Sequence, residues 1–219
     1  MGFDTDCRRC ERLAAFLDEV RGQFPDYFSR PVPSFGDPAA HVLIVGLAPG
    51  KHGANATGRP FTGDHAGIML YRTLYEFGFS SHPTSTSVDD GLELHDCRIT
   101  NAVRCLPPGN KPVTQEVDTC NEFLADELAS LSRPGIVVAL GTIAHRAVIR
   151  ALGHKFSAFR FGHGVEHAMG QNLHLVDSYH CSRYNTQTRR LTEAMFQEVF
   201  RSVRNRIGHE TVIGDVVKV

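Results

Sequence analysis

The sequence predicts an α/β fold in which a parallel sheet is covered by helices on both faces. Two patterns predict it: short apolar runs bounded by glycine, proline or asparagine, and longer stretches with an apolar residue every three or four positions. Runs that are apolar at nearly every position are typical of strands buried on both faces. Because strand-like and helix-like stretches alternate along the chain, they form βαβ units, which build parallel sheets.

Four runs have the composition of buried strands: His41–Leu47, Arg98–Val103, Gly135–Leu140 and Leu173–Tyr179. Four helices follow from the 3.6-residue period of the apolar positions. The first carries Leu70, Leu74 and Phe77, and the second carries Val117, Cys120, Leu124, Leu128 and Leu131. The third is capped by Thr142 and runs to about Leu152, and the fourth starts at Thr188 and carries Leu191, Met195, Val199, Val203 and Ile207. Ligands in such folds bind beyond the carboxyl ends of the strands, so functional residues are expected directly after each run.

Composition excludes several classes of protein. Hydrophobic residues make up 42% and charged residues 21% of the 219 positions, which is ordinary for a globular chain and not for a disordered or fibrous one. The longest apolar run, 42–48, is far shorter than the roughly 20 residues of a membrane-spanning helix. The charged N-terminal residues do not resemble a secretory signal. Without repeats or linkers, we expect one domain over residues 1–219, and its net charge of −1 confines any nucleic-acid contact to a local basic patch.

The six cysteines are more consistent with metal ligands or free thiols than with disulfides, because the chain has no export signal. Cys7 and Cys10 form a CxxC pair, the spacing at which two thiolates reach one metal centre. Cys105 and Cys120 form a second, looser pair around a Pro-Pro-Gly turn. The alternative is that these residues are small buried hydrophobic side chains.

The segment after the first run is rich in glycine. Six of the 20 glycines fall between Gly46 and Gly67, and glycine at this density lets the backbone approach a ligand closely. The segment lacks the phosphate-binding patterns GxxxxGK[ST] and GxGxxG. A mobile surface loop is the alternative, although such a loop seldom contains an apolar residue like Phe61.

Polar residues also follow the second and fourth runs. Asn101 offers one donor and one acceptor side by side, the complement of the amide edge of a pyrimidine, unless it only ties down its loop. The fourth run leads into the sequence HCSRYNT, from His180 to Thr186. Residues 179–206 contain six arginines and two glutamates, and among these arginines Arg183 lies in the predicted loop and is the best candidate for a phosphate contact.

Taken in order, these pieces resemble the uracil-DNA glycosylase superfamily over about residues 7–200, most closely family 5 (type b) and next family 4 (type a). Family 4 reads GEAPG after its first strand, and family 1 reads GQDPY. This chain reads GLAPG, so Leu47 and Ala48 stand where those families have an acid. Loss of the acid is typical of family 5, as is the string GLAPGKHG…TGRPFTGD. The superfamily motif HPS continues toward NTxTxRLT in family 5, and this chain reads HCSRYNTQTRRLT, with Cys181 in place of proline.

The resemblance implies a three-layer α/β/α sandwich around a four-stranded parallel sheet. It implies a DNA-repair enzyme that hydrolyses the N-glycosidic bond of uracil, and of other deaminated bases such as hypoxanthine, and leaves an abasic site. Cys7, Cys10, Cys105 and Cys120 would hold a structural [4Fe-4S] cluster, whereas Cys97 and Cys181 fall outside the pattern. Four thiolates also suit structural zinc. The expected partner is DNA rather than a membrane, and we expect a monomer in the cytoplasm, with the chromosomal DNA.

The resemblance also implies roles for individual side chains. Phe61 would stack on the flipped base, and Asn101 would read its edge. His180 would donate to the base O2 as negative charge develops there, and Asn185 would help position the loop of His180. The remaining residues assigned to base or DNA binding are Gly46, Leu47, Ala48, Pro49, Gly50, Ser182 and Arg183.

Without an acid at position 47 or 48, another group must activate the water. Asp64, in the FTGD segment, is the candidate, although it precedes a helix and could equally be an N-cap. His145, on a predicted helix, is expected to be structural. Two alternatives stay open at this point: an enzyme that acts mainly on hypoxanthine or other damaged bases, and a non-catalytic iron–sulfur protein that binds DNA or DNA damage.

Overall fold

The computed structural model describes residues 3–216, with side chains for residues 3–208. Its sheet has six strands in the order β1-β3-β2-β4-β6-β5. The strands are β1 (Phe35–Gly36), β2 (Val42–Gly46), β3 (Cys97–Asn101), β4 (Gly135–Leu140), β5 (Glu166–Gly170) and β6 (Leu173–Ser178). The helices are α1 (Glu11–Gln23), α2 (Ala54–Thr57), α3 (His65–Glu76), α4 (Thr114–Ser130), α5 (Thr142–Ala151), α6 (Arg183–Gln187) and α7 (Glu193–Val216), with short 3₁₀ turns at Pro108–Asn110 and Phe156–Ala158.

The four predicted strands form the parallel centre of the sheet, β3-β2-β4-β6. The sheet is wider than the four-stranded parallel sheet expected, because β1 and β5 add antiparallel edges and make it mixed. β1 has only two residues, and β5 has one buried residue among five, so neither carries the apolar run that marks a central strand.

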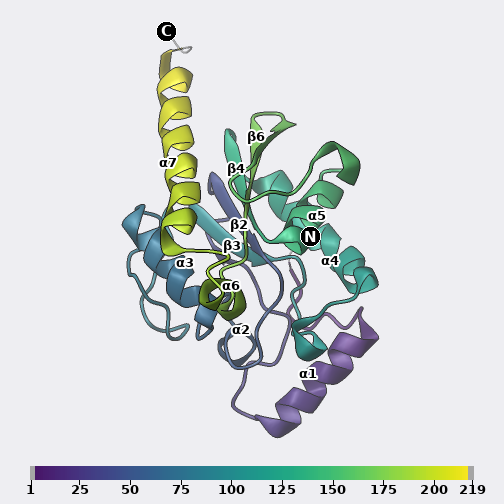
Figure 1. Cartoon of the computed structure of the whole chain (residues 1–219). Coiled ribbons are helices and arrows are strands. Elements are labelled where there is room, and N and C mark those ends of the chain that lie inside the picture. The colour runs from purple at the N-terminus through teal and green to yellow at the C-terminus, as the bar shows by residue number, and fades with distance from the viewer. Residues whose placement is uncertain (1–2, 217–219) are drawn as a thin grey trace.

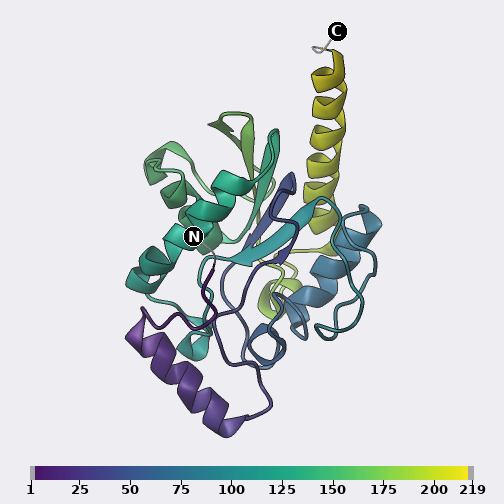
Figure 2. The ribbon, with the colours of Figure 1, turned by 180° about the vertical axis from the view of Figure 1, so that it is seen from behind.

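Helices cover both faces of the sheet, as alternating side chains of each strand require (Figure 1). On β2, Val42 and Ile44 pack with residues of α3 and α7, while Leu43 and Val45 pack with residues of α4 and α5. The view from behind shows α1 apart from both layers, at the end of the molecule opposite the far end of α7 (Figure 2). There α1 packs its apolar side on the segment that follows β3.

The predicted helices α3, α4 and α5 are present, and the fourth prediction was wrong at its start. Thr188 is the C-cap of the short helix α6, and α7 begins five residues later, at Glu193. Thr142 is the first residue of α5 and not its cap, a position that Gly141 takes with φ 96°. Within residues 3–216, no helix combines the length and the apolar character needed to cross a bilayer.

A nearly buried cluster of charges joins α4 to β3 and to the segments that precede β1 and follow β3. Glu127, on α4, pairs with Arg104 at 2.9 Å and with Arg98 at 3.2 Å, and accepts a hydrogen bond from Ser34. The Arg104 side chain is only 2% exposed. Burial alone would raise the pKa of Glu127, but Arg104, with help from Ser34 and Arg98, outweighs burial and holds that pKa below its usual value.

We expect Glu127→Gln to lower the free energy of unfolding at pH 7 by about 3 kcal/mol, because it leaves a buried guanidinium without its counter-charge. The folded-state pKa lies below the unfolded one, so the stabilisation is present above about pH 4.5 and is lost as the pH falls through the folded-state pKa. Denaturant titration at pH 7 and pH 3 measures both effects. Glu122→Gln is the control. Glu122 also lies on α4 but pairs with Arg9 at an exposed position, so this change should lower the free energy of unfolding by less than about 1 kcal/mol. If Glu127→Gln lowered the free energy of unfolding equally at both pH values, the stabilisation would not come from the ionised carboxylate of Glu127.

Candidate active site

A cavity of about 540 Å³ opens at the carboxyl ends of β2, β3, β4 and β6, where the parallel topology predicts a ligand. It gathers residues that are far apart in the sequence. The predicted site residues in its lining are Leu47, Ala48, Gly50, Phe61, Asp64, Asn101, His180, Ser182, Arg183 and Asn185. Of the predicted base- and DNA-binding residues, Gly46 and Pro49 do not line the cavity.

Asn101, the last residue of β3, brings an amide to the cavity floor. Its side chain is 3% exposed, and its Oδ1 is buried without a hydrogen-bond partner among the described residues. A buried polar atom of this kind costs about 1–3 kcal/mol unless a ligand satisfies it. In the β2–β3 register Asn101 lies opposite Gly46, where a β-carbon would collide with Asn101 Oδ1 and would come within 2.6 Å of the Phe61 ring. Gly46 therefore does not contact the ligand space itself, but it leaves room for the side chains of Asn101 and Phe61 that do.

Phe61 lies at the cavity with an unusual backbone. Its φ is +58°, in the left-handed region that a bulky residue avoids, and its side chain is 6% exposed. Two neighbours hold it there: Tyr71 donates a 2.7 Å hydrogen bond to the carbonyl of Pro60, and Gly67 leaves room for the Phe61 carbonyl, with which a β-carbon would collide. Strain maintained by surrounding packing is common at ligand sites.

His180 lies near Phe61, with ring centroids 6.1 Å apart and planes inclined by 27°. Burial lowers the pKa of His180 to about 4, so the imidazole is neutral at pH 7. The loop is held by Asn185, whose Nδ2 donates a 2.8 Å hydrogen bond to the His180 carbonyl. Cys181, which replaces proline, is fully buried in the core, and burial raises the pKa of its thiol to about 12.

Asp64 occupies the N-cap position of α3, but its carboxylate makes no capping hydrogen bond, so the N-cap expectation for its side chain was wrong. Oδ2 instead accepts from the backbone N–H of Ala54 at 3.1 Å. The carboxylate lies so close to the backbone that a β-carbon at Gly50 or Gly53 would collide with it. Burial raises the pKa of Asp64, although the N–H groups of Ala54 and Gly50 partly oppose this. Two motif glycines therefore provide space for a partly buried carboxylate at the cavity.

At the rim, Ser182 and Arg183 follow His180. The Ser182 hydroxyl accepts a hydrogen bond from the Asn185 N–H and so caps α6. Arg183 is exposed. Other residues that line the cavity were not predicted from the sequence, among them Tyr179 and Phe161. Tyr179 follows β6 directly and could have been found by the rule that found His180, whereas Phe161 lies between α5 and β5 and carries no motif.

The four predicted cysteine ligands meet away from the cavity, on the other side of the segment that follows β3. Cys7, Cys10, Cys105 and Cys120 line one small void, and none of them is in a disulfide. Burial raises the pKa of Cys105, with further contributions from the neighbouring thiols of Cys120, Cys7 and Cys10. The Arg104 N–H donates to the Cys120 sulfur at 3.4 Å.

The spacing of these thiols tests which metal group they fit. Tetrahedral zinc holds its four sulfurs about 3.8 Å apart. Among the described residues, the group of three or more ligand atoms lying within 4.8 Å of one another is His145, His167 and Asp177, and it does not include the thiols. A four-iron cluster carries each thiolate on a separate iron and needs the wider spacing. The thiolate-only donor set suits an iron–sulfur cluster, and the sulfurs as they lie are not gathered closely enough for one tetrahedral zinc ion.

Comparisons with known proteins all indicate the same family. A model of the uracil DNA glycosylase superfamily matches residues 33–204. The chain is 47% identical to a type-5 uracil-DNA glycosylase of Thermus thermophilus, over 93% of this chain and 95% of that one. It is 44% identical to a type-5 enzyme of Pyrobaculum aerophilum, over 90% and 87%. A type-4 enzyme of Archaeoglobus fulgidus is 28% identical, over 88% and 86%.

The crystal structure of wild-type Pedobacter heparinus SMUG2 shares the fold, with a TM-score of 0.50 and 12% identity over 95% of this chain and 94% of that one. The chain belongs to the uracil DNA glycosylase superfamily, in its type-5 branch.

Proposed function

We propose that this protein is a monofunctional glycosylase that hydrolyses the N-glycosidic bond of uracil in DNA and leaves an abasic site. The observation that carries the proposal is the buried amide oxygen of Asn101, which has no hydrogen-bond partner among the described residues and shares one cavity with the rings of Phe61 and His180. A pyrimidine edge would satisfy that amide, and an aromatic ring would stack on the base. Relatives named uracil-DNA glycosylase at 42–47% identity support the same activity.

Catalysis begins with removal of the base from the stack, which costs a few kcal/mol and admits the base to a side pocket. In the proposed mechanism Phe61 stacks on the flipped ring and Asn101 pairs with its edge. Leu47 and Ala48 form an apolar part of the lining and carry no acid. The volume of about 540 Å³ also leaves room for a purine, so hypoxanthine and other deaminated bases are included as substrates.

The leaving base takes negative charge as the bond breaks. His180, neutral at pH 7, donates an N–H hydrogen bond to the base O2 and stabilises that charge without giving up its proton. Asn185 is a positioning residue, since its amide holds the backbone carbonyl of His180. Preorganised donors of this kind typically lower the activation free energy by about 3 kcal/mol.

Asp64 is proposed to activate the water that attacks the sugar. Its raised pKa makes it a better proton acceptor than an ordinary aspartate, and its backbone hydrogen bond from Ala54 fixes its orientation. Ser182 and Arg183, at the rim, are assigned to the DNA backbone. Arg183 supplies the charge for a phosphate contact.

Cys7, Cys10, Cys105 and Cys120 would hold a [4Fe-4S] cluster. When bound, the cluster supplies a structural cross-link and no step of the hydrolysis. It would join α1, α4 and the segment that follows β3.

A non-catalytic, cluster-bearing protein that binds DNA damage is the competing function, because Leu47 and Ala48 leave the first motif without its acid. Incubation with a uracil-containing oligonucleotide followed by alkali separates the two. We expect strand cleavage at the uracil position, which reports an abasic site. A shifted oligonucleotide with no alkali-labile site would overturn the enzyme and favour the binding protein.

We expect His180→Ala to lower the single-turnover rate of uracil release about 100-fold or more while DNA affinity stays nearly unchanged, because the charge it meets exists only in the transition state. Arg183→Ala is the counterpart. It should weaken binding to all DNA sequences alike and reduce the salt dependence by about one counterion. A His180→Ala protein that cleaves normally but binds poorly would contradict the mechanism.

Asp64→Asn separates water activation from support of the backbone. The amide keeps an oxygen for the Ala54 N–H but cannot accept a proton, so we expect the rate to fall about 100-fold or more with little change in melting temperature. Asp26→Asn, which alters an exposed aspartate in a turn, is the control and should keep both values. Equal rates for Asp64→Asn and wild type would remove Asp64 from the chemistry.

We expect anaerobically purified protein to contain iron and to show the broad visible absorbance of an iron–sulfur cluster. Cys120→Ala should lose both, together with soluble yield, because it removes one of four ligands. Cys97→Ala is the matched control, since Cys97 is equally buried but lies in the core of the sheet. One zinc ion per chain and no iron in the wild-type protein would contradict the cluster.

A further inference from the structure

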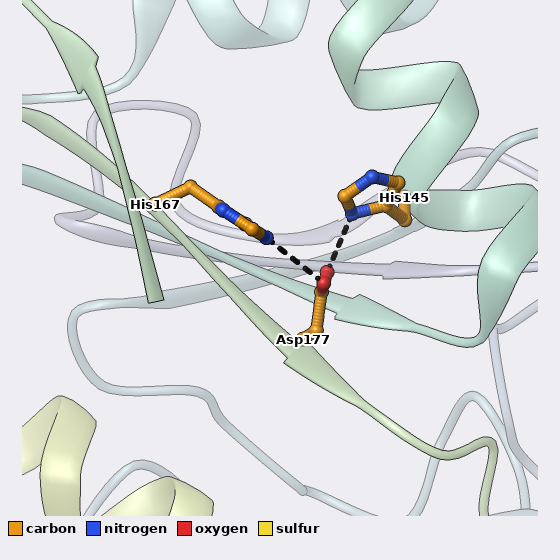
Figure 3. A group of neighbouring side chains, drawn as sticks. All are labelled: His145, His167 and Asp177. Atoms are coloured by element: carbon orange, nitrogen blue, oxygen red, sulfur yellow. Dashed lines mark hydrogen bonds and ion pairs between the residues drawn. The ribbon is translucent and has the colours of Figure 1, made fainter. Parts of the chain in front are cut away.

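Behind the cavity wall, three titratable side chains form a buried cluster: His145 on α5, His167 on β5 and Asp177 on β6 (Figure 3). Each carboxylate oxygen of Asp177 faces one imidazole. Oδ1 lies 2.7 Å from His145 Nδ1, and Oδ2 lies 3.1 Å from His167 Nε2. Asp177 is fully buried, and the His145 side chain is 3% exposed. None of the three residues lines the cavity.

The hydrogen bonds of His145 fix where its protons lie. Its Nε2 is 3.1 Å from the backbone carbonyl of Phe159, which can only accept, so Nε2 carries a hydrogen. Nδ1 then faces Asp177 Oδ1 at 2.7 Å, a distance at which two lone pairs would repel each other unless a proton lay between them. A buried hydrogen bond therefore joins His145 to Asp177.

The cluster holds the segment between α5 and β5 at two points. His145 binds the carbonyl of Phe159, and Asp177 Oδ2 accepts a hydrogen bond from the N–H of Gly162 at 3.3 Å. Phe161 lies between these two points. Its ring packs edge-on against the His145 ring, with centroids 5.6 Å apart and planes at 79°, and it lines the base cavity.

Backbone hydrogen bonds join the same segment to the strand that leads to His180. The Gly164 N–H donates to the Asp177 carbonyl at 2.8 Å, and the Asp177 N–H donates to the Val165 carbonyl at 2.9 Å. Three residues after Asp177 the chain reaches His180. The position of Phe161 in the cavity wall is therefore tied to β6, the strand that precedes His180.

We propose that Phe161 is a second aromatic contact for the flipped base, and that His145, Asp177 and His167 are positioning residues that hold it at the cavity. This inference rests on the proposed function, because it names a residue that touches the same base. A metal ion at the cluster is the competing interpretation. It is disfavoured because a hydrogen-bond distance separates His145 from Asp177 and because the second nitrogen of His145 and both oxygens of Asp177 already have backbone or side-chain partners.

Binding to two matched DNA duplexes tests the contact with the base. One duplex carries 2′-fluoro-2′-deoxyuridine, whose glycosidic bond resists cleavage, and the other carries a tetrahydrofuran abasic analogue, which has no base. Phe161→Ala should weaken binding of the first about tenfold and leave binding of the second within about twofold of wild type. Phe156→Ala, which removes an exposed ring in the same segment, should change neither. A loss of the same size on both duplexes would mean that Phe161 only supports the fold.

A double-mutant cycle tests the positioning role. Asp177→Ala should reproduce the base-dependent loss of Phe161→Ala, and the double variant should lose no more than either single one, because the cluster acts through Phe161. Asp177→Asn should stay within about threefold of wild type, since an amide can donate to His145 Nδ1 and accept from Gly162. Additive losses would overturn the positioning role. If Asp177→Ala gives no folded protein, His167→Ala takes its place in the cycle.

Two further outcomes complete the test. A divalent metal ion present at one per chain, lost in Asp177→Asn and retained in Cys120→Ala, would show that the cluster is a metal site and overturn its assignment as a set of positioning residues. If wild-type protein releases no uracil, the proposed function fails. If wild-type protein releases uracil and Phe161→Ala binds the fluorinated duplex as tightly as wild type, only the inference about Phe161 fails.

Discussion

The site depends on the space that Gly46 leaves at the end of β2, where a β-carbon would collide with both the amide of Asn101 and the ring of Phe61. The parallel register of β2 and β3 creates this constraint, because it sets Gly46 opposite Asn101. The amide and the ring can therefore occupy one cavity only while position 46 has no side chain. The left-handed backbone of Phe61 and the space beside Gly67 depend on the same approach of the glycine-rich segment to the sheet.

Buried charge is handled differently on the two sides of the molecule. Around Glu127, two arginines supply full counter-charges, and the carboxylate is held in its ionised form. No arginine among the described residues pairs with Asp64, and burial instead raises the pKa of its carboxylate. The first arrangement stabilises the fold, whereas the second leaves a carboxylate that can exchange a proton. The position of the arginines thus separates a structural acid from the acid proposed to activate water.

The sequence was sufficient for the central strands, because a strand buried on both faces is apolar along its whole length. It was sufficient to place Asn101 and His180 at the cavity, because both lie at or directly after such a strand, where parallel strands end together. It was insufficient for β5, whose exposed positions break the apolar pattern. It also missed α1, although Leu13, Leu17 and Val20 carry a helical spacing.

Site residues set by long-range contacts were beyond the sequence pattern. The Asp64 side chain turns to the backbone of residues 50–54 and not to its own helix, a choice that depends on the absence of β-carbons at Gly50 and Gly53. Phe161 reaches the cavity because Asp177 and His145, from other elements, hold its segment. No helical or strand period encodes either arrangement.

The dense glycines have a consequence for how this site can change over generations. Every missense change that alters one nucleotide of a glycine codon introduces a residue with a β-carbon. At Gly46, Gly50, Gly53 and Gly67 that atom would overlap the groups that form the pocket. Leu47 and Ala48 already carry side chains at the cavity surface, so their codons can vary without such an overlap. New base preferences are therefore more accessible through positions 47 and 48 than through the glycines that flank them.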